Sequence, residues 1–171
     1  MDLSIVIPLF NERDNLAPLH AELEPVLNAT GRSYEVVFID DGSTDGGEAV
    51  LREIKARDAH VRVIRLARNS GQTAALACGL QLAQGRVIVA LDADGENDPA
   101  DIPRLLAKLN EGYDLVSGWR TDRWRNAALT RRLPSVAANS LISRITGVEL
   151  HDYGCTLKAY RGDLARRLML Y

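Results

Sequence analysis

The regular alternation of short apolar runs with helix-like segments along residues 1–118 is the feature that most constrains this fold. The runs are rich in β-branched residues, which favours buried strands. They predict strands at Ser4–Leu9, Tyr34–Ile39, Val61–Leu66, Val87–Leu91 and Asp114–Ser117. The segments between them have apolar residues at helical spacing. They predict helices at Asn15–Leu27, Gly47–Arg57, Gly71–Gln84 and from Pro99 to about Glu111.

Strands that alternate with helices in this way specify an α/β fold, a Rossmann-like and mostly parallel sheet with helices on both faces. The length of 171 residues predicts a single domain, 1–171. The alternation ends after Gly118. The segment Trp119–Arg132 is basic and irregular, and Ser135–Ile145 is expected to be helical.

Polar residues gather where three of the expected strands end. Ligands bind beyond the carboxyl ends of the strands in open parallel sheets. These polar residues are Asn11 and Glu12 after the first strand, Asp40, Asp41 and Ser43 after the second, and Asp92, Asp94 and Glu96 after the fourth. We therefore expect these carboxylates to meet at one edge of the sheet.

Carboxylates this close raise one another's pKa unless a cation or a hydrogen-bond donor offsets them. A hard divalent metal such as Mg²⁺ resolves this, because it takes one or two carboxylates and completes its shell with phosphate and water. Asp92 and Asp94 suit that role, since both can turn toward one ion from an extended loop. Taken alone, Asp40–Ser43 is equally a turn with a helix cap, and Asp92–Asp94 is a short pattern that recurs by chance.

Charge is unevenly distributed along the chain. Residues 1–118 carry 11 Lys and Arg against 19 Asp and Glu, a net charge of −8. Residues 119–171 carry 10 against 4, a net charge of +6. An acidic half that holds a cation and a basic half that faces phosphate or anionic lipid would explain this asymmetry, as would clustering on solvated faces.

Several classes of protein and site are disfavoured. No apolar window is long enough to predict a transmembrane helix, and the N-terminus lacks the basic start of a signal peptide. Cys78 and Cys155 lie far apart without metal-ligand spacing, so reduced thiols are expected. No GxxxxGK[ST] or GxGxxG glycine motif follows the first strand. A bound diphosphate would then depend on metal and basic side chains.

The ordered motifs resemble family 2 inverting glycosyltransferases with the GT-A fold. The matching stretches are Ile7–Glu12, Ile39–Asp45, Arg68–Leu76, Leu91–Pro99 and Ser117–Arg120. Two later stretches, Arg131–Ser135 and His151–Arg161, narrow the resemblance to polyprenyl-phosphate sugar transferases, the dolichol-phosphate mannose synthases and undecaprenyl-phosphate transferases. The match covers nearly the whole chain.

The resemblance implies site residues position by position. Those implied to contact the nucleotide are Pro8, Phe10, Glu12, Asp40, Asp41 and Asp92, with Asp40 and Asp41 as the pair that recognises base and ribose. Those implied at the metal, Mg²⁺ or Mn²⁺, are Asp92, Asp94 and Glu96. Glu96 stands where many relatives carry Gln.

The implied catalytic set is Asp94, Asp152, Arg120 and Arg131. Arg120 and Arg131, or the neighbouring Arg132, match basic residues near the donor diphosphate and acceptor phosphate. Asp152 matches an aspartate proposed as a base in some relatives. A phosphate monoester is already largely ionised at neutral pH, so a strong base is not required and Asp152 is equally a turn residue.

The implied function is metal-dependent, inverting transfer of a sugar from a UDP- or GDP-sugar to polyprenyl phosphate. Residues 1–118 would bind the nucleotide sugar and 119–171 the acceptor. Relatives usually continue further, so we expect a truncated chain whose full-length form works at the cytoplasmic face of a membrane, without nucleic acid. The alternatives are a glycan or polysaccharide acceptor, or nucleotide binding without turnover. A phosphatase site is weaker, because its paired aspartates belong after the first strand.

Overall fold

The computed structural model describes residues 1–119 and 155–170. Arg120, Arg131, Asp152 and the expected helix Ser135–Ile145 lie outside the described residues. The strands are β1 (Leu3–Leu9), β2 (Tyr34–Asp40), β3 (Val61–Arg65), β4 (Val87–Ala90), β5 (Leu115–Ser117) and β6 (Lys158–Arg161). The helices are α1 (Arg13–Ala29), α2 (Gly47–Arg57), α3 (Gln72–Leu82), α4 (Ile102–Asn110) and α6 (Gly162–Ala165), with a 3-10 turn, η1 (Pro99–Asp101), before α4.

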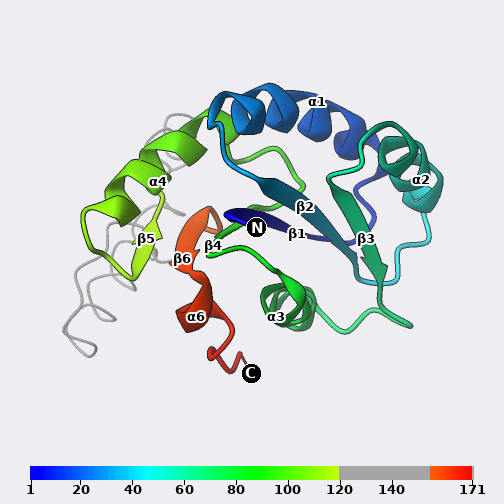
Figure 1. The fold of residues 1–171 in the computed structure, drawn as a ribbon. Coiled ribbons are helices and arrows are strands. Elements are labelled where there is room, and N and C mark those ends of the chain that lie inside the picture. The colour runs from blue at the N-terminus through cyan, green and yellow to red at the C-terminus, as the bar shows by residue number, and fades with distance from the viewer. Residues whose placement is uncertain (120–154, 171) are drawn as a thin grey trace, which may run out of the picture.

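The six strands form one sheet in the order β3-β2-β1-β4-β6-β5 (Figure 1). β1 pairs in parallel with both β2 and β4, and β2 pairs in parallel with β3. The mostly parallel sheet expected from the alternation is therefore confirmed. Because β1 lies between β2 and β4 and runs parallel to both, the carboxyl ends of these three strands are neighbours. The polar loops that follow them therefore meet at one edge of the sheet.

Helices cover both faces of this sheet. α1, α2 and α4 lie on one face, and α3 and α6 lie on the other (Figure 1). Every residue of β1 is buried because alternate side chains enter two different apolar layers. Ile5 packs with the leucines of α1, whereas Val6 packs on the side of α3. None of the helices in the described ranges combines the length and hydrophobicity needed to cross a bilayer.

The strand β6 was not predicted from the sequence. It runs antiparallel between β4 and β5, so that Ala159 lies opposite both Val89 and Val116. Within residues 1–119 and 155–170, β5 consequently joins the sheet through β6 alone and has no parallel neighbour. A four-residue strand is defined by these nonlocal hydrogen bonds, and its local sequence carries too few residues to show a period.

A buried carboxylate, on the face of the sheet that α3 covers, joins neighbouring strands near their amino ends. Glu35 is 2% exposed and accepts hydrogen bonds from Ser4 Oγ at 2.6 Å, Arg62 Nη1 at 2.6 Å and the backbone N–H of Gln84 at 2.7 Å. Ser4 Oγ in turn accepts from the N–H of Gly85. Burial acts to raise the pKa of Glu35, but these hydrogen bonds outweigh it and hold the pKa below its ordinary value.

Glu35→Gln should lower the free energy of unfolding at neutral pH by about 1–3 kcal/mol, because it removes a charge-assisted acceptor. The depressed pKa stabilises the fold fully above the ordinary value of 4.5, and this contribution is lost as pH falls through the folded-state pKa. In urea unfolding between pH 3 and 7, the free energy of unfolding of the variant should therefore fall less steeply toward low pH than that of the wild type. If the free energy of unfolding fell equally steeply with pH in both proteins, ionised Glu35 would not be what stabilises the fold.

Candidate functional site

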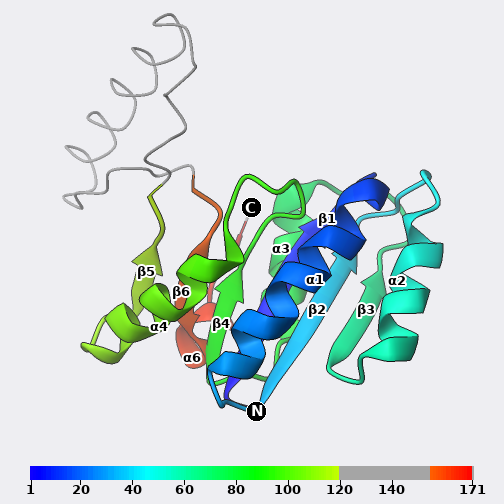
Figure 2. The same ribbon diagram turned by 90° about the horizontal axis from the view of Figure 1, so that it is seen from above.

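The loops that follow β1, β2 and β4 meet at one edge of the sheet (Figure 2). They enclose a cleft of about 370 Å³ together with the segment that opens α3. Six of the residues predicted from the sequence line this cleft: Pro8, Phe10, Glu12, Asp41, Asp92 and Asp94. The parallel pairing of β1 with both neighbours is what brings side chains more than 50 positions apart into one space.

Asp41 lies on the β2 side of the cleft and is held by the backbone. Its Oδ1 accepts from the N–H of Ser70 and its Oδ2 from the N–H of Gly71, both at 2.8 Å. The side chain is only 2% exposed. A carboxylate offers about four lone-pair directions. Two of them are used by these N–H groups, so the carboxylate that lines the cleft keeps acceptor capacity for a further donor.

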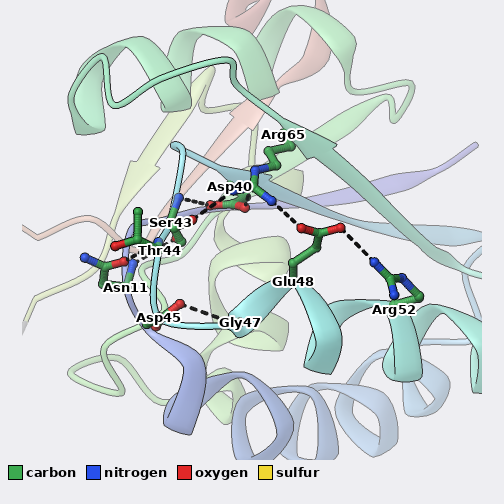
Figure 3. A network of polar contacts seen from close by, with 9 residues as sticks. All are labelled: Asn11, Asp40, Ser43, Thr44, Asp45, Gly47, Glu48, Arg52 and Arg65. Carbon is green, nitrogen blue, oxygen red and sulfur yellow. Dashed lines mark hydrogen bonds and ion pairs between the residues drawn. The ribbon is translucent and has the colours of Figure 1, made fainter.

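Asp40 does not line the cleft. Its carboxylate accepts from the N–H of Ser43 at 2.8 Å and lies 3.5 Å from Nε of Arg65 (Figure 3). Arg65 also pairs with Glu48 and donates to the carbonyl of Ser43 at 2.9 Å. Asp40 therefore secures the turn after β2 in this structure, and its contact with a nucleotide stays a prediction.

The turns after β1 and β2 are tied to each other. Asn11, with a φ of 58°, donates its N–H to Ser43 Oγ and accepts from the N–H of Thr44 through its side chain (Figure 3). Asp45 accepts from the N–H groups of Gly47 and Arg13. Burial acts to raise the pKa of Asp45, but these backbone hydrogen bonds leave it below its ordinary value. These hydrogen bonds join the turn after β1 to the turn after β2, outside the lining of the cleft.

Gly42 lets the β2 turn approach the segment that opens α3. Its φ is 75°, and a Cβ there would lie 2.8 Å from the carbonyl carbon of Arg68 and 2.9 Å from the nitrogen of Asn69. Gly42→Ala should lower the free energy of unfolding by about 2–4 kcal/mol, through left-handed strain and displaced backbone. Urea denaturation checks this.

Gly46→Ala is the matched control, because Gly46 has a φ of 86° in the same loop but no atom within 4 Å of the added methyl. It should cost only the backbone strain, about 1–2 kcal/mol. A loss for Gly42→Ala no larger than that for Gly46→Ala would show that the close approach is unimportant.

Asp92 and Asp94 line the side of the cleft that follows β4. Asp92 Oδ1 accepts from the side-chain amide of Gln72 at 2.8 Å, and Asp94 Oδ1 accepts from the N–H of Glu96 at 2.9 Å. Among the described residues, no three His, Cys, Asp or Glu side chains are arranged to enclose a metal by themselves. Two carboxylates at an open cleft fit Mg²⁺ or Mn²⁺, which take few protein ligands and keep phosphate and water.

Glu96 binds Asp94 through its backbone N–H but does not line the cleft. It lines a second cavity, of about 930 Å³, that borders α4 and β5. Trp119 and Cys155 line the same cavity, and Asn97 is fixed there by a hydrogen bond to Thr156. A metal contact from Glu96 stays a prediction, as do the roles of Arg120, Arg131 and Asp152, which lie outside the described ranges.

The sequence analysis assigned no site role to the segment that opens α3. Asn69, Gly71 and Gln72 all line the cleft. Their motif contributed to the resemblance, but the expected helix start gave no sign that its N–H groups bind Asp41 or that Gln72 reaches Asp92. Those contacts span 20 to 30 residues.

The family model described as glycosyl transferase family 2 matches residues 4–169. Dodecaprenyl-phosphate galacturonate synthase of Rhizobium johnstonii is 41% identical over 99% of this chain and 51% of its own length. Undecaprenyl-phosphate 4-deoxy-4-formamido-L-arabinose transferase of Shewanella sediminis is 42% identical over 98% of this chain and 50% of its length. The chain thus spans about half the length of the curated relatives it matches.

Solved structures share the fold at lower identity. Glucosyl-3-phosphoglycerate synthase of Mycobacterium tuberculosis, in complex with Mn²⁺ and UDP, matches with a TM-score of 0.67 and 21% identity over 95% of this chain and 57% of its own. The mannosyltransferase PcManGT of Pyrobaculum calidifontis, in complex with GDP-Man and Mn²⁺, matches with a TM-score of 0.63 and 20% identity. The match covers 99% of this chain and 47% of that one. The expected GT-A fold is confirmed.

Proposed function

The chain belongs to glycosyl transferase family 2, and from this premise we propose that it supplies the donor site of a transferase that uses polyprenyl phosphate as acceptor. The reaction proposed is metal-dependent and inverting, and it moves a sugar from a UDP- or GDP-sugar to the lipid phosphate. The relatives named for dodecaprenyl and undecaprenyl phosphate support this acceptor over a glycan.

The observation that carries the proposal is the shared cleft between the ends of β2 and β4. Asp41 lies on one side of it and Asp92 and Asp94 on the other. This arrangement offers hydrogen-bond acceptors to the N–H and O–H groups of a nucleoside at one end. At the other end it offers oxygen ligands for a cation that carries a diphosphate.

On the nucleoside side, Phe10 and Pro8 supply apolar surface and Asp41 supplies the acceptor. Phe10 is 42% exposed, which leaves its ring open to a base. Both faces of an aromatic base favour such contacts. Because Asp41 is already fixed by two N–H groups, no ordering of this side chain opposes binding.

On the diphosphate side, Asp92 and Asp94 would hold Mg²⁺ or Mn²⁺. When bound, that ion supplies charge neutralisation for the departing nucleoside diphosphate. An oxygen of the acceptor phosphate attacks the anomeric carbon on the face opposite the diphosphate. The bond between this oxygen and the carbon forms as the bond between the carbon and the diphosphate breaks, so the configuration at the carbon inverts. Arg120 and Arg131 are proposed to stabilise the phosphate charges, in keeping with the basic half of the chain.

The proposed acceptor implies that the full-length protein works at a membrane surface. Polyprenyl phosphate is a lipid, so its phosphate reaches the cleft only at the bilayer interface. A net charge of +6 on residues 119–171 favours anionic headgroups. We propose that this surface is the cytoplasmic face.

The proposal is tested in two steps. Thermal unfolding of the chain with saturating UDP or GDP and Mn²⁺ should show a melting temperature raised by about 5–10 °C for one of the nucleotides. The full-length protein, incubated with radiolabelled nucleotide sugars and undecaprenyl phosphate, should then place label in an organic extract. Label in a water-soluble polymer would favour a glycan acceptor, and binding without any transfer would favour a non-catalytic module.

A further inference from the structure

A three-residue segment at the start of α3 holds both sides of the cleft. The N–H groups of Ser70 and Gly71 bind Asp41, and the side-chain amide of Gln72 binds Asp92 at 2.8 Å. We propose that Gln72 is a positioning residue that orients Asp92 toward the cation and diphosphate of the donor. This inference rests on the proposed function, since it names a residue that prepares the same site.

The chemistry of an amide suits this role. The terminal torsion of an aspartate has broad wells, so an unrestrained carboxylate at a half-exposed position would rotate. A hydrogen bond from Nε2 of Gln72 to Oδ1 restrains that rotation. A Lys or Arg would also donate, but its positive charge would compete with a metal ion for the carboxylate. A neutral donor orients Asp92 and leaves its charge for the cation.

The position of Gln72 on a rigid helix gives the contact its precision. The helix α3 is locked to the sheet, because Ala75 is fully buried and Gly79 packs so closely that a Cβ there would lie 2.3 Å from Val6 Cγ1. The next residue toward the N-terminus, Gly71, is fastened to Asp41. The helix therefore sets the separation between the nucleoside side and the diphosphate side of the cleft.

The same helix provides a matched control. Gln81, near its other end, also donates its side-chain amide, in this case to the backbone carbonyl of Arg166 at 2.7 Å. It lies outside the cleft. Gln72→Met and Gln81→Met each replace an exposed glutamine by an apolar side chain of similar length and helix propensity, and each removes one hydrogen bond.

The experiment measures the affinity for the cation and the affinity for the nucleoside separately. Mn²⁺ binding in the presence of UDP or GDP is followed by electron paramagnetic resonance, and uridine or guanosine binding without metal is followed by calorimetry. Gln72→Met should raise the Mn²⁺ concentration for half-saturation about tenfold, the low end expected when a group that orients a metal ligand is lost. Nucleoside affinity and the melting temperature without ligand should stay at wild-type values. Gln81→Met should change neither affinity.

The contrary outcomes are distinct. An unchanged Mn²⁺ half-saturation for Gln72→Met would refute the positioning role while leaving the proposed function intact. Equal losses of Mn²⁺ and nucleoside affinity would also refute it, because they would show that Gln72 supports the cleft as a whole. If the wild-type chain binds neither UDP nor GDP with Mn²⁺, the proposed function fails, and this inference fails with it.

Discussion

Asp41→Ala is expected to weaken nucleotide binding by more than about 100-fold, equivalent to about 2.7 kcal/mol. The carboxylate accepts hydrogen bonds from the N–H groups of Ser70 and Gly71. Its removal takes this acceptor from Ser70 and leaves Gly71 with the longer bond, of 3.2 Å, to the side-chain oxygen of Asn69. Each charge-assisted hydrogen bond contributes about 1.5–3 kcal/mol. The acceptor proposed for the nucleoside is lost at the same time. Calorimetric titration with UDP and GDP in the presence of Mn²⁺ measures the effect.

Asp45→Ala is the control that distinguishes a loss of nucleotide binding from a loss of stability. Asp45 also accepts two backbone N–H groups, from Arg13 at 2.8 Å and Gly47 at 2.9 Å, but it does not line the cleft. Both variants should lose stability, about 1–3 kcal/mol each. Only Asp41→Ala should lose nucleotide binding when both are measured well below their melting temperatures. Equal binding losses would mean that Asp41 acts only as a fold anchor.

Asp94→Ala should reduce sugar transfer by the full-length protein by at least about 10³-fold. With this carboxylate gone, Asp92 is the one predicted metal ligand left in the cleft, and the cation proposed to neutralise the departing diphosphate is held poorly. Asp94 is exposed, and its carboxylate accepts a hydrogen bond from the N–H of Glu96 two residues along the chain, so stability should change by less than about 1 kcal/mol. Radiolabel transfer and urea unfolding give the two values.

An exposed aspartate elsewhere controls for the loss of negative charge. Asp163 lies in α6, away from the cleft, and Asp163→Ala should keep wild-type transfer. If Asp94→Ala retained transfer at the level of Asp163→Ala, the metal-dependent mechanism would be wrong. A reduced rate that recovers at high Mn²⁺ concentration would support a ligand role.

Local sequence was sufficient to predict most of the sheet. The run Ser4–Leu9 is apolar and β-branched, and the strand β1 forms there with every residue buried. The aspartates after β4 were found because an apolar run ends directly before them. Asp98 followed by Pro99 correctly predicted the start of a helical segment, since the side chain of Asp98 accepts the N–H of Ala100.

What the sequence missed depends on nonlocal contacts. The strand β6 exists because residues 158–161 pair with β4, some 70 positions earlier. Nothing within Asp40–Ser43 reveals that Asp40 faces Arg65 from β3 while Asp41 faces α3. The part played by Gln72 likewise depends on the distance between two loops, which only the packed helix α3 fixes.

The most direct test of the donor site is a crystal structure of the chain with Mn²⁺ and whichever of UDP or GDP gives the larger thermal shift. Anomalous scattering from manganese would locate the ion independently of the nucleotide. We expect a manganese peak within bonding distance of Asp92 or Asp94, next to the diphosphate, with the nucleoside against Phe10 and Asp41. Manganese and nucleotide seated instead in the cavity beside α4 and β5, with the cleft holding only water, would contradict it.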